Sequence, residues 1–362
     1  MAKKVLILVN HDVVIYNFRK ELVERLLSDG NQVVISSPYG ERIDDLVEMG
    51  CKYIEAKIER HGTNPLNELK LMSYYKKIMR DIKPDVVLTY TIKPNIYGGL
   101  AAKKYGIPYI ANITGLGTAV EKKSIMQQIT IILYKLAFSN IQRVFFQNTE
   151  NMKFFRDNNI VADKHRLVPG SGVNLDHFQI LDYPSEDTIE FVFISRIMKE
   201  KGIDQYIEAA EYITKKYPNT KFHVCGFCEE AYEEILSDLQ NKNILTYHGM
   251  IRDIRDVLMK THCTIHPTYY PEGLSNVLLE SAASGRPIIT TDRSGCREVV
   301  DHGINGFMIK QKDSNDLIEK VESFLKLGIK EKRQMGLAGR SKVEKEFDRQ
   351  IVVDAYIEEI YI

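Results

Sequence analysis

The sequence predicts an α/β protein made of two doubly wound domains, each with a parallel sheet covered by helices on both faces. Short β-branched runs alternate with helical patterns in the first half, the alternation stops over residues 168–187, and a second series begins at Ile189. Strands separated by helices indicate βαβ units and a parallel sheet. With 362 residues, 44% of them hydrophobic, the chain is long enough to bury two cores.

The first series contains short expected strands that are rich in Val, Ile and aromatic residues. They are VLILV at Val5, VVIS at Val33, KYIEA at Lys52, DVVLTY at Asp85, PYIANIT at Pro108 and RVFFQN at Arg143. Helical periodicity is expected near residues 18–27, 42–49, 66–82 and 124–138. In open parallel sheets of this kind, ligands bind at loops that follow the carboxyl ends of strands.

The second series repeats the same alternation after a break. The break, residues 168–187, is rich in Pro, Gly and Asp and has no periodicity, so the domain boundary is placed there. The expected strands are IEFVFIS at Ile189, KFHVCG at Lys221, ILTYHG at Ile244, CTIHP at Cys263, PIITTD at Pro287 and GFMIK at Gly306. The predicted domains are residues 1–170 and 171–345, followed by a helix over 346–362 that is able to cross back to the first domain.

Charge and cysteine content limit the class of protein further. Residues 1–170 carry 25 Lys and Arg against 17 Asp and Glu, and the remainder carries 24 against 32. A basic half indicates a phosphate-bearing or membrane-surface partner, although a solvated surface also drifts in charge by chance; no nucleic-acid partner is expected. Five scattered cysteines favour a reducing compartment. We expect a cytoplasmic protein, with a peripheral position on the membrane's cytoplasmic face left open.

Two groups of charged residues in the second domain are candidates for a diphosphate site. Arg196 follows a strand, and Lys201 opens a helix five residues later, where side-chain charge and unpaired N–H groups attract an anion. Glu272 and Glu280 lie eight residues apart across a helix expected to begin near Leu274. Carboxylates at that spacing can accept hydrogen bonds from a sugar ring and a ribose. Each group alone also fits ordinary solvated charges around helix caps.

The combination of these patterns is more specific than its parts. R-x4-K-G, then E-G-L-S-N-x3-E, then G-R-P-I-I-T-T-D resembles the family 4 retaining glycosyltransferases across almost the whole chain. The resemblance implies the GT-B fold, with two Rossmann-like domains that face an inter-domain cleft. It also implies that the donor diphosphate is bound without a metal, so no cofactor is expected beyond a nucleotide sugar, by family habit a UDP-sugar, as co-substrate.

The resemblance assigns roles to residues of the second, nucleotide-sugar-binding domain. The implied catalytic residues are Glu272, Arg196 and Lys201: the two cations hold and neutralise the leaving diphosphate, and Glu272 contacts the transferred sugar. Glu280 would contact the ribose. The N–H groups of Leu274, Ser275 and Asn276 are expected to be unpaired donors near the phosphates. The full donor-binding set is Arg196, Lys201, Gly226, Met250, Ile251, Glu272, Gly273, Leu274, Ser275, Asn276 and Glu280, with a donor-side loop at 295–298.

The first domain resembles the subgroup that builds capsular polysaccharide, exopolysaccharide or lipid-linked glycans. The resemblance lies in NHDVVIYNFRKEL and TYTIKPNIYGGLAAKKYGIPYIANITGLGT. It implies transfer of a hexose or N-acetylhexosamine to a growing, polyprenyl-diphosphate-linked oligosaccharide that lies against the first domain. The acceptor-side candidates are His11, Tyr16, Arg19, Lys93, Asn95, Thr114, Gly115 and Gly117.

Two features of the first domain leave alternatives open. Many relatives carry a histidine where this chain has Thr114, and a threonine cannot ionise near neutral pH. His11 is a candidate substitute, although a lone histidine after a strand is more often structural. The stretch EKKSIMQQITIILYKLAFSNIQR either rests on a membrane surface or is a helix buried against the sheet.

Other functions fit the sequence less well. A GT-B UDP-sugar 2-epimerase and a non-catalytic nucleotide-sugar-binding module are the alternatives that remain. Cys225 and Cys228 form C-x2-C without a second pair, and His262 and His266 fall in an expected strand, so no metal site is predicted. An NAD-dependent dehydrogenase fits poorly because the first turn lacks G-x-G-x-x-G.

Overall fold

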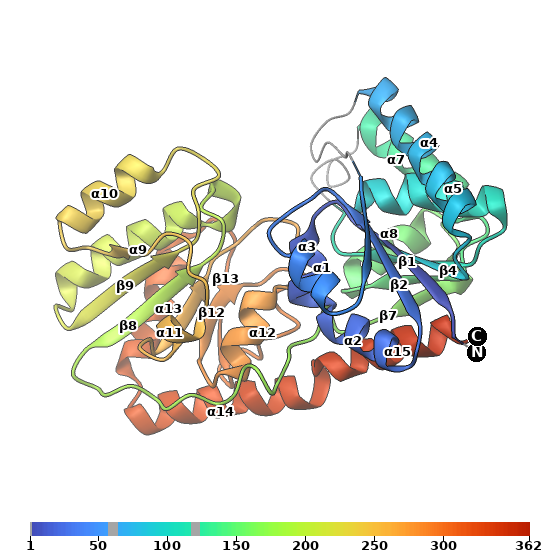
Figure 1. The fold of residues 1–362 in the computed structure, drawn as a ribbon. Coiled ribbons are helices and arrows are strands. Elements are labelled where there is room, and N and C mark those ends of the chain that lie inside the picture. The colour runs from blue at the N-terminus through green and yellow to red at the C-terminus, as the bar shows by residue number, and fades with distance from the viewer. Residues whose placement is uncertain (1, 57–63, 117–123) are drawn as a thin grey trace. The chain divides into compact units, whose positions relative to one another are not determined.

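The computed structural model describes residues 2–56, 64–116 and 124–362 and divides the chain into two compact units (Figure 1). The first unit comprises residues 1–172 and 349–362, and the second comprises residues 173–348. Each unit contains one parallel sheet, with seven strands in the first and six in the second. The predicted fold class, α/β with two doubly wound parallel sheets, is confirmed.

The sheet of the first unit has the strand order β3-β2-β1-β4-β5-β6-β7, and every neighbouring pair is parallel. Val5 of β1 lies in register with Val33 of β2 on one side and Val86 of β4 on the other, so the order reverses between β1 and β4. The strands are β1 (Lys4–Leu8), β2 (Gln32–Ser37), β3 (Lys52–Glu55), β4 (Val86–Tyr90), β5 (Tyr109–Ile113), β6 (Arg143–Phe146) and β7 (His165–Leu167). The short edge strand β7 was not expected from the sequence.

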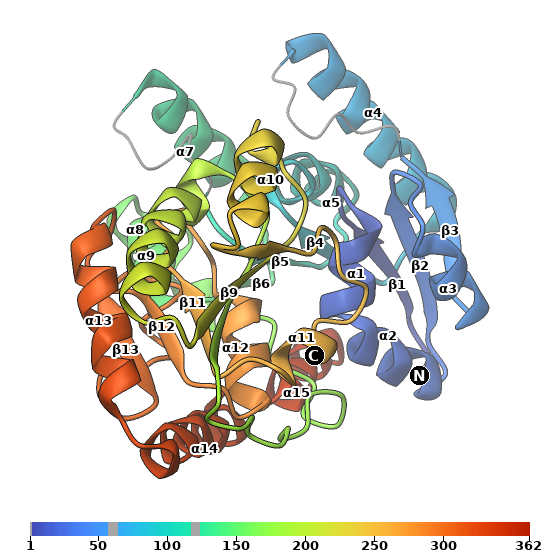
Figure 2. The ribbon, with the colours of Figure 1, turned by 90° about the vertical axis from the view of Figure 1, so that its left-hand side faces the viewer.

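Helices cover both faces of this sheet because its strands are apolar on both sides. Val5 and Ile7 pack with α1 (Asp12–Phe18), α2 (Lys20–Ser28), α3 (Ile43–Glu48) and α15 (Arg349–Ile360). Leu6 and Leu8 pack on the opposite face with α4 (Pro65–Ile82), the π-helix η1 (Pro94–Gly98), α5 (Gly99–Tyr105), α7 (Ile125–Phe138) and α8 (Thr149–Asp157). A 3-10 turn, η2 (Ala162–Lys164), precedes β7. Figure 2 shows α4 and α7 with α5 between them.

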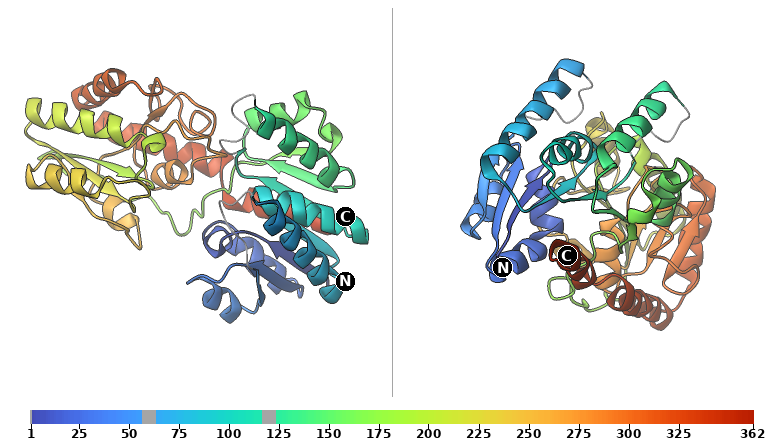
Figure 3. Two further views of the ribbon diagram at one scale, coloured as in Figure 1. Left: turned by 90° about the horizontal axis from the view of Figure 1, so that it is seen from above. Right: turned by 90° about the vertical axis from the view of Figure 1, so that its right-hand side faces the viewer.

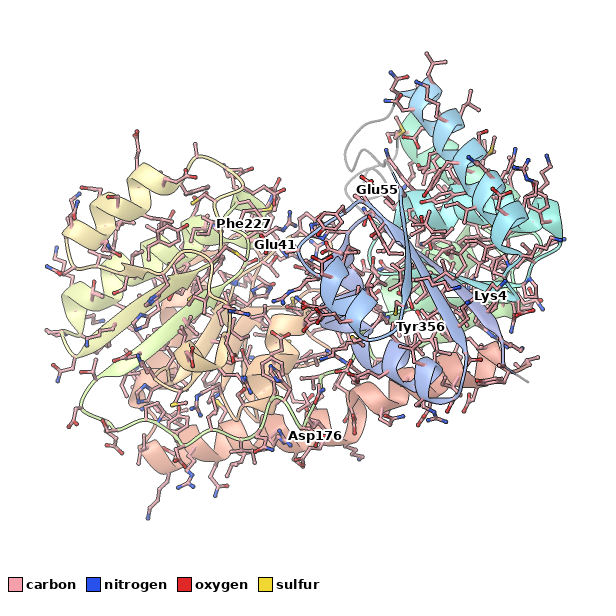
Figure 4. All side chains as sticks on the ribbon, viewed as in Figure 1. Lys4, Glu41, Glu55, Asp176, Phe227 and Tyr356 are labelled. Carbon is pink, nitrogen blue, oxygen red and sulfur yellow. The ribbon has the colours of Figure 1, made fainter. Side chains whose placement is uncertain are left out.

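The C-terminal helix α15 is an integral part of the first unit. Tyr356 is 1% exposed, and its hydroxyl accepts a hydrogen bond from Asn112 Nδ2 at 2.8 Å (Figure 4). The buried carboxylate of Glu359 pairs with Arg143 at 2.8 Å and with Arg166 at 3.2 Å. Helix α15 is therefore held by hydrogen bonds and ion pairs as well as by apolar contact.

The second unit has the strand order β10-β9-β8-β11-β12-β13, also parallel throughout, with the reversal between β8 and β11. Its strands are β8 (Ile189–Ile194), β9 (Thr220–Cys225), β10 (Thr246–Tyr247), β11 (Cys263–His266), β12 (Ile288–Thr291) and β13 (Gly306–Ile309). Its helices are η3 (Lys199–Lys201), α9 (Ile203–Lys216), α10 (Glu233–Asn241), α11 (Arg255–Leu258), α12 (Asn276–Ala283), α13 (Ser314–Lys326) and α14 (Ile329–Glu346). Figure 3 shows this unit from above.

Adjacent residues of the second sheet also face opposite sides. Ile289 packs in the cluster that includes residues of α9, α10 and α13, whereas Ile288 packs in the cluster that includes residues of α12 and α14. Arg286 of the G-R-P motif is 1% exposed and donates to the carbonyl oxygens of Leu258 and Asp182, each at 2.7 Å. This arginine therefore ties the segment that precedes β8 to the end of α11, within the second unit. Among the described helices, none is both long and apolar enough to cross a membrane.

Candidate functional site

Arg196, Lys201 and Glu272 of the second unit lie in loops at the point where the order of its strands reverses. The loop at residues 195–202 follows β8, and the loop at residues 267–275 follows β11. Because β8 and β11 are parallel neighbours, both loops leave the same edge of the sheet. In doubly wound sheets this reversal point is where ligands bind. The topology therefore brings together two motifs that lie about seventy residues apart in the sequence.

Arg196 and Lys201, in the loop after β8, are each paired with a carboxylate. The Arg196 guanidinium forms an ion pair with Glu229, and the Lys201 ammonium forms an ion pair with Glu272. Lys201 is only 7% exposed, so its charge is largely shielded from water. Burial alone would raise the pKa of Glu272, but the Lys201 charge, helped by Arg196, outweighs burial and holds that pKa below its ordinary value.

A tyrosine that the sequence analysis did not select lies against both cations. The centre of the Tyr270 ring is 4.7 Å from Lys201 Nζ and 5.3 Å from Arg196 Cζ. The negative face of an aromatic ring attracts cations at such distances. Tyr270 therefore holds the two positive charges side by side without neutralising either. Its position two residues before Glu272 in TYYPEG was the available signal.

The loop after β12 packs directly on Glu272. Gly295 has φ +91°, and a Cβ there would lie 2.8 Å from Cβ of Glu272, so only glycine fits. Glu298 fixes this turn, because its carboxylate accepts from the Gly295 N–H at 2.7 Å and from the Ser294 hydroxyl at 3.1 Å. The 295–298 loop is thus a wall of the Glu272 site.

His266, at the end of β11, is a buried neighbour of the ion pair. It is 1% exposed, and burial together with the Lys201 charge lowers its pKa to about 4. Its Nε2 lies 3.3 Å from Ser275 Oγ, and its Nδ1 has no hydrogen-bond partner. The imidazole is therefore neutral near neutral pH. From the sequence alone, His266 was predicted not to bind a metal and was given no other role.

The start of α12 differs from the expectation in a way that removes one predicted donor. The helix begins at Asn276 with Ser275 as its N-cap, two residues later than Leu274. The Ser275 N–H donates to the Gly295 carbonyl at 2.8 Å, so the prediction that it is an unpaired donor is wrong. Leu274 is 4% exposed and packs in the core. Buried Gly273 and half-buried Glu280 flank this segment, with Glu280 in α12.

The expected base-side loops follow β9 and β10 and touch one another. The Gly226 N–H donates to the Gly249 carbonyl at 2.8 Å. Gly226 has φ +136°, and a Cβ would lie 1.8 Å from the Ser195 carbonyl oxygen, so packing alone requires glycine here. Met250 is 70% exposed, whereas Ile251 is partly buried against the cluster that includes Cys225. Met250, and Phe227 of the loop after β9 at 43% exposed, are therefore open to a ligand.

In the first unit, five of the eight acceptor-side candidates lie in the segments that follow β1 and β4, within or beside α1 and η1. His11 is the N-cap of α1, and its Nδ1 accepts from the Val13 N–H at 3.3 Å, which favours the structural role. The Tyr16 ring is partly buried, with Arg42 Cζ at 4.6 Å and Lys20 Nζ at 5.3 Å from its centre. Arg42 and Lys20, both partly buried, thus lie against the Tyr16 ring.

Two further candidates, Arg19 and Asn95, are buried, and a third, Lys93, is engaged in an ion pair. Arg19 is 3% exposed; it donates to the Phe18 carbonyl and stacks between Tyr90 and Tyr356, at 5.2 and 5.7 Å from the ring centres. In this structure Arg19 therefore faces the interior, and we correct the expectation that it faces an acceptor. Asn95 is 1% exposed and donates to the Asn112 carbonyl at 3.0 Å. Lys93 forms an ion pair of 2.7 Å with Glu68.

The end of β4 also carries a strained residue that the sequence analysis missed. Thr91 has φ +69°, which is rare for a β-branched side chain. Its Oγ1 and the Oδ1 of Asn95 are buried without a hydrogen-bond partner. Nothing in the sequence signals such a conformation. Thr114 and Gly115 follow β5 and are partly buried, and Gly117 lies outside the described residues.

Cys225, Cys228 and His262 make contacts that stabilise the fold. Burial raises the pKa of the Cys225 thiol to about 12, and Cys228 Sγ lies 3.7 Å from the Tyr247 hydroxyl. His262 Nδ1 accepts from the Glu190 N–H at 3.1 Å, and Nε2 lies 3.0 Å from the Ser185 carbonyl. Within the part of the chain that the structure describes, no group of three or more His, Cys, Asp or Glu is placed to hold a metal ion.

Comparison with known proteins identifies the family. Residues 179–342 match the family described as glycosyl transferases group 1, and residues 4–148 match the family described as glycosyl transferase 4-like. The chain is 27% identical to the N,N'-diacetylbacillosaminyl-diphospho-undecaprenol alpha-1,3-N-acetylgalactosaminyltransferase of Campylobacter jejuni, over 95% of this chain and 94% of that protein. It is 23% identical to the UDP-Gal:alpha-D-GlcNAc-diphosphoundecaprenol alpha-1,3-galactosyltransferase of Escherichia coli, over 69% and 68%.

A solved structure has the same fold over the full length. HepE of Anabaena, in complex with UDP and glucose, superposes with a TM-score of 0.80 at 15% identity, covering 99% of this chain and 98% of that one. At that identity the likeness shows the fold. Together with the two family matches it means that the chain belongs to the group 1 (family 4) glycosyltransferases and has the GT-B fold.

Proposed function

We propose that this glycosyltransferase moves a hexose or an N-acetylhexosamine from a UDP-sugar to a polyprenyl-diphosphate-linked oligosaccharide, with retention of the anomeric configuration. The observation that carries the donor part is the pairing of Lys201 with Glu272 beside Arg196 and Tyr270, at the reversal point of the second sheet. A bound diphosphate needs fixed positive charge around it, and a bound sugar needs a group that accepts hydrogen bonds from its hydroxyl groups. These side chains provide both.

Arg196 and Lys201 are the proposed diphosphate ligands. An arginine fork and a shielded ammonium form charge-assisted hydrogen bonds with phosphate oxygens. Each cation is already balanced by a carboxylate, so an arriving diphosphate exchanges one anionic partner for another and the charge is not left unpaired. That exchange leaves the Glu272 carboxylate available to the hydroxyl groups of the sugar next to the diphosphate.

The acceptor part of the proposal rests on relatives. The Campylobacter jejuni and Escherichia coli relatives are both named for acceptors linked to undecaprenyl through a diphosphate. The basic composition of the first half of this chain suits an acceptor that carries a diphosphate at a membrane surface. We place that acceptor near Tyr16, Lys93, Thr114 and Gly115.

For the reaction we propose front-face substitution. The bond between the anomeric carbon and the diphosphate oxygen breaks, the acceptor oxygen bonds to that carbon on the same face, and the hydroxyl proton passes to the departing diphosphate. Arg196 and Lys201 stabilise the negative charge that develops on the leaving group. Thr114 cannot take the proton, and His11 is occupied as a helix cap. Trapping of a covalent sugar on Glu272 would contradict this scheme.

The decisive assay supplies the enzyme with UDP-galactose, UDP-N-acetylgalactosamine or UDP-N-acetylglucosamine and a synthetic polyprenyl-diphosphate-sugar, and measures product mass and linkage. The proposal expects one α-linked sugar to be added from at least one donor. Conversion of the donor sugar in the absence of an acceptor would instead indicate the epimerase. Donor binding without transfer to any acceptor of this class would favour the non-catalytic module.

A further inference from the structure

Helix α7 (Ile125–Phe138) carries two apolar faces, of which only one is buried among the residues that the structure describes. Tyr134 and Phe138 point into the first unit and are 2% and 0% exposed. The opposite face exposes large apolar side chains: Ile125 at 82%, Ile129 at 45%, Ile132 at 55% and Leu136 at 51%. Their spacing of i, i+4, i+7 and i+11 aligns them in one stripe along the helix.

The distribution of polar residues on α7 differs from that on an ordinary surface helix. Gln127 and Thr130 lie on the buried side, while Ile125, Ile129 and Ile132 face outward. A surface helix normally turns its polar residues to water. A contiguous exposed apolar stripe marks an interaction surface. The sequence left open whether this helix is buried or contacts a membrane. These alternatives are not exclusive, because one face of α7 is buried and the other is exposed among the described residues.

The part of the sequence that contains α7 is rich in basic residues. Residues 86–149 carry seven Lys and Arg against a single acidic residue, Glu121. Lys135 is exposed on α7 itself, and Lys103 of α5 donates to the Leu136 carbonyl at 3.3 Å, which places its ammonium at one end of the stripe. Lys104 and Tyr105, both exposed, continue the surface on α5.

Helix α4 adds apolar side chains on the same side of the unit. Helices α4 and α7 both pack against α5 on one face of the first sheet (Figures 2 and 3). The first turns of α4 expose Leu66 at 67% and Leu69 at 57%. The apolar surface is thus not confined to a single helix.

We infer that the exposed stripe of α7, with the lysines beside it, docks the enzyme on the surface of an anionic lipid bilayer. An apolar stripe enters the boundary between headgroups and acyl chains, and flanking lysines bind anionic headgroups. A second copy of the chain fits less well, since a symmetric contact would set these lysines against their own copies. The inference rests on the proposed function, because a lipid-linked acceptor lies in such a bilayer, and α7 is the next described helix after Thr114 and Gly115.

The test measures binding of the full chain to vesicles by flotation. The wild type is expected to bind vesicles of mixed phosphatidylcholine and phosphatidylglycerol, and to bind phosphatidylcholine alone roughly tenfold less. Ile129→Ser with Ile132→Ser should lower binding to the anionic vesicles by roughly tenfold or more. Lys103→Gln with Lys104→Gln should act in the same direction. The matched control, Ile235→Ser with Ile304→Ser, removes two exposed apolar residues of the second unit and should bind like the wild type.

Transfer to a water-soluble acceptor with a short prenyl chain separates docking from function. The α7 variant should keep that activity and its melting temperature, and should lose transfer to acceptor embedded in vesicles. Equal vesicle binding by the wild type and the α7 variant would overturn the docking surface. The docking surface would also be overturned if the wild type formed a dimer that does not bind vesicles and the α7 variant were a monomer. Vesicle binding through the stripe without any transfer to the soluble acceptor would support docking and contradict the proposed function.

Discussion

The Lys201 ammonium lies 4.7 Å from the centre of the Tyr270 ring, although the two residues come from loops that follow different strands. The same ring lies 5.3 Å from Arg196 Cζ. The ring therefore sets where the two cations of the proposed diphosphate site lie.

Replacing Tyr270 should weaken donor binding without unfolding the protein. A cation–π contact contributes about 0.5–2 kcal/mol, so Tyr270→Ala should raise the donor KM by roughly twofold to thirtyfold. Tyr270→Phe keeps the ring and should stay within about threefold of the wild type. Tyr269→Ala is the control, because the Tyr269 ring lies 4.6 Å from Lys312 Nζ instead. A donor KM unchanged in Tyr270→Ala would refute this role.

Loss of either cation should reduce transfer much more than loss of a neighbouring lysine. A hydrogen bond to a charged group contributes about 1.5–3 kcal/mol, so Arg196→Ala or Lys201→Met should lower kcat/KM by roughly tenfold to 150-fold. Lys199→Ala removes an exposed lysine from the same turn and should leave kcat/KM unchanged.

Lys201→Met also leaves the Glu272 carboxylate without this partner, which should destabilise the fold. The double variant Lys201→Met with Glu272→Gln removes both charges and should recover stability but not activity. Thermal unfolding and steady-state kinetics on the same samples separate the two effects. Recovery of transfer in the double variant would mean that Lys201 serves only to neutralise Glu272.

Gly295→Ala should lower the free energy of unfolding more than Gly303→Ala, where the added Cβ meets no neighbouring atom. The added Cβ would lie 2.8 Å from Glu272 Cβ at a residue with φ +91°. Gly303 has φ +79° with nothing within 4 Å, so Gly303→Ala suffers only the backbone strain, about 1 kcal/mol. We expect Gly295→Ala to lose more unfolding free energy than this control and also to lower kcat/KM. Equal losses in the two variants would argue against the close packing.

Stability should depend on pH through His266. Its folded pKa of about 4 lies below the unfolded value of 6.5, so unfolding takes up a proton between these values and the free energy of unfolding falls as pH decreases through that window. His266→Asn should flatten this dependence by up to about 1.4 kcal/mol per pH unit relative to the wild type. Denaturant unfolding at a series of pH values measures how the free energy of unfolding depends on pH in the two proteins. Parallel curves for the two proteins would show that His266 does not titrate in this way.

Most of the fold follows from local patterns in the sequence. Expected helices at 66–82 and 124–138 correspond to α4 and α7 within one residue at either end, because apolar periodicity identifies long amphipathic helices. The edge strand β7 (His165–Leu167) was missed because three residues carry too little pattern. The expected start of α12 was two residues early, since Ser275 and Leu274 both suit a helix start by sequence.

The site was only partly predictable. Arg196, Lys201 and Glu272 were found because their combination resembles a family, while Tyr270 and His266 were not assigned a role. Lys201 and Glu272 are 71 residues apart, and their contact depends on β8 and β11 being neighbours in the sheet. Local patterns do not encode such contacts. The positive φ of Thr91 and the burial of Arg19 likewise arise only from tertiary packing.

The central claim is that the donor diphosphate binds at Arg196 and Lys201 in the second unit. Calorimetric titration with UDP tests it most directly, using the wild type, Arg196→Ala, Lys201→Met with Glu272→Gln, and the Lys199→Ala control. The account predicts that the wild type and Lys199→Ala bind UDP equally and that the other two variants bind at least roughly tenfold more weakly. Equal affinity in all four proteins would contradict it.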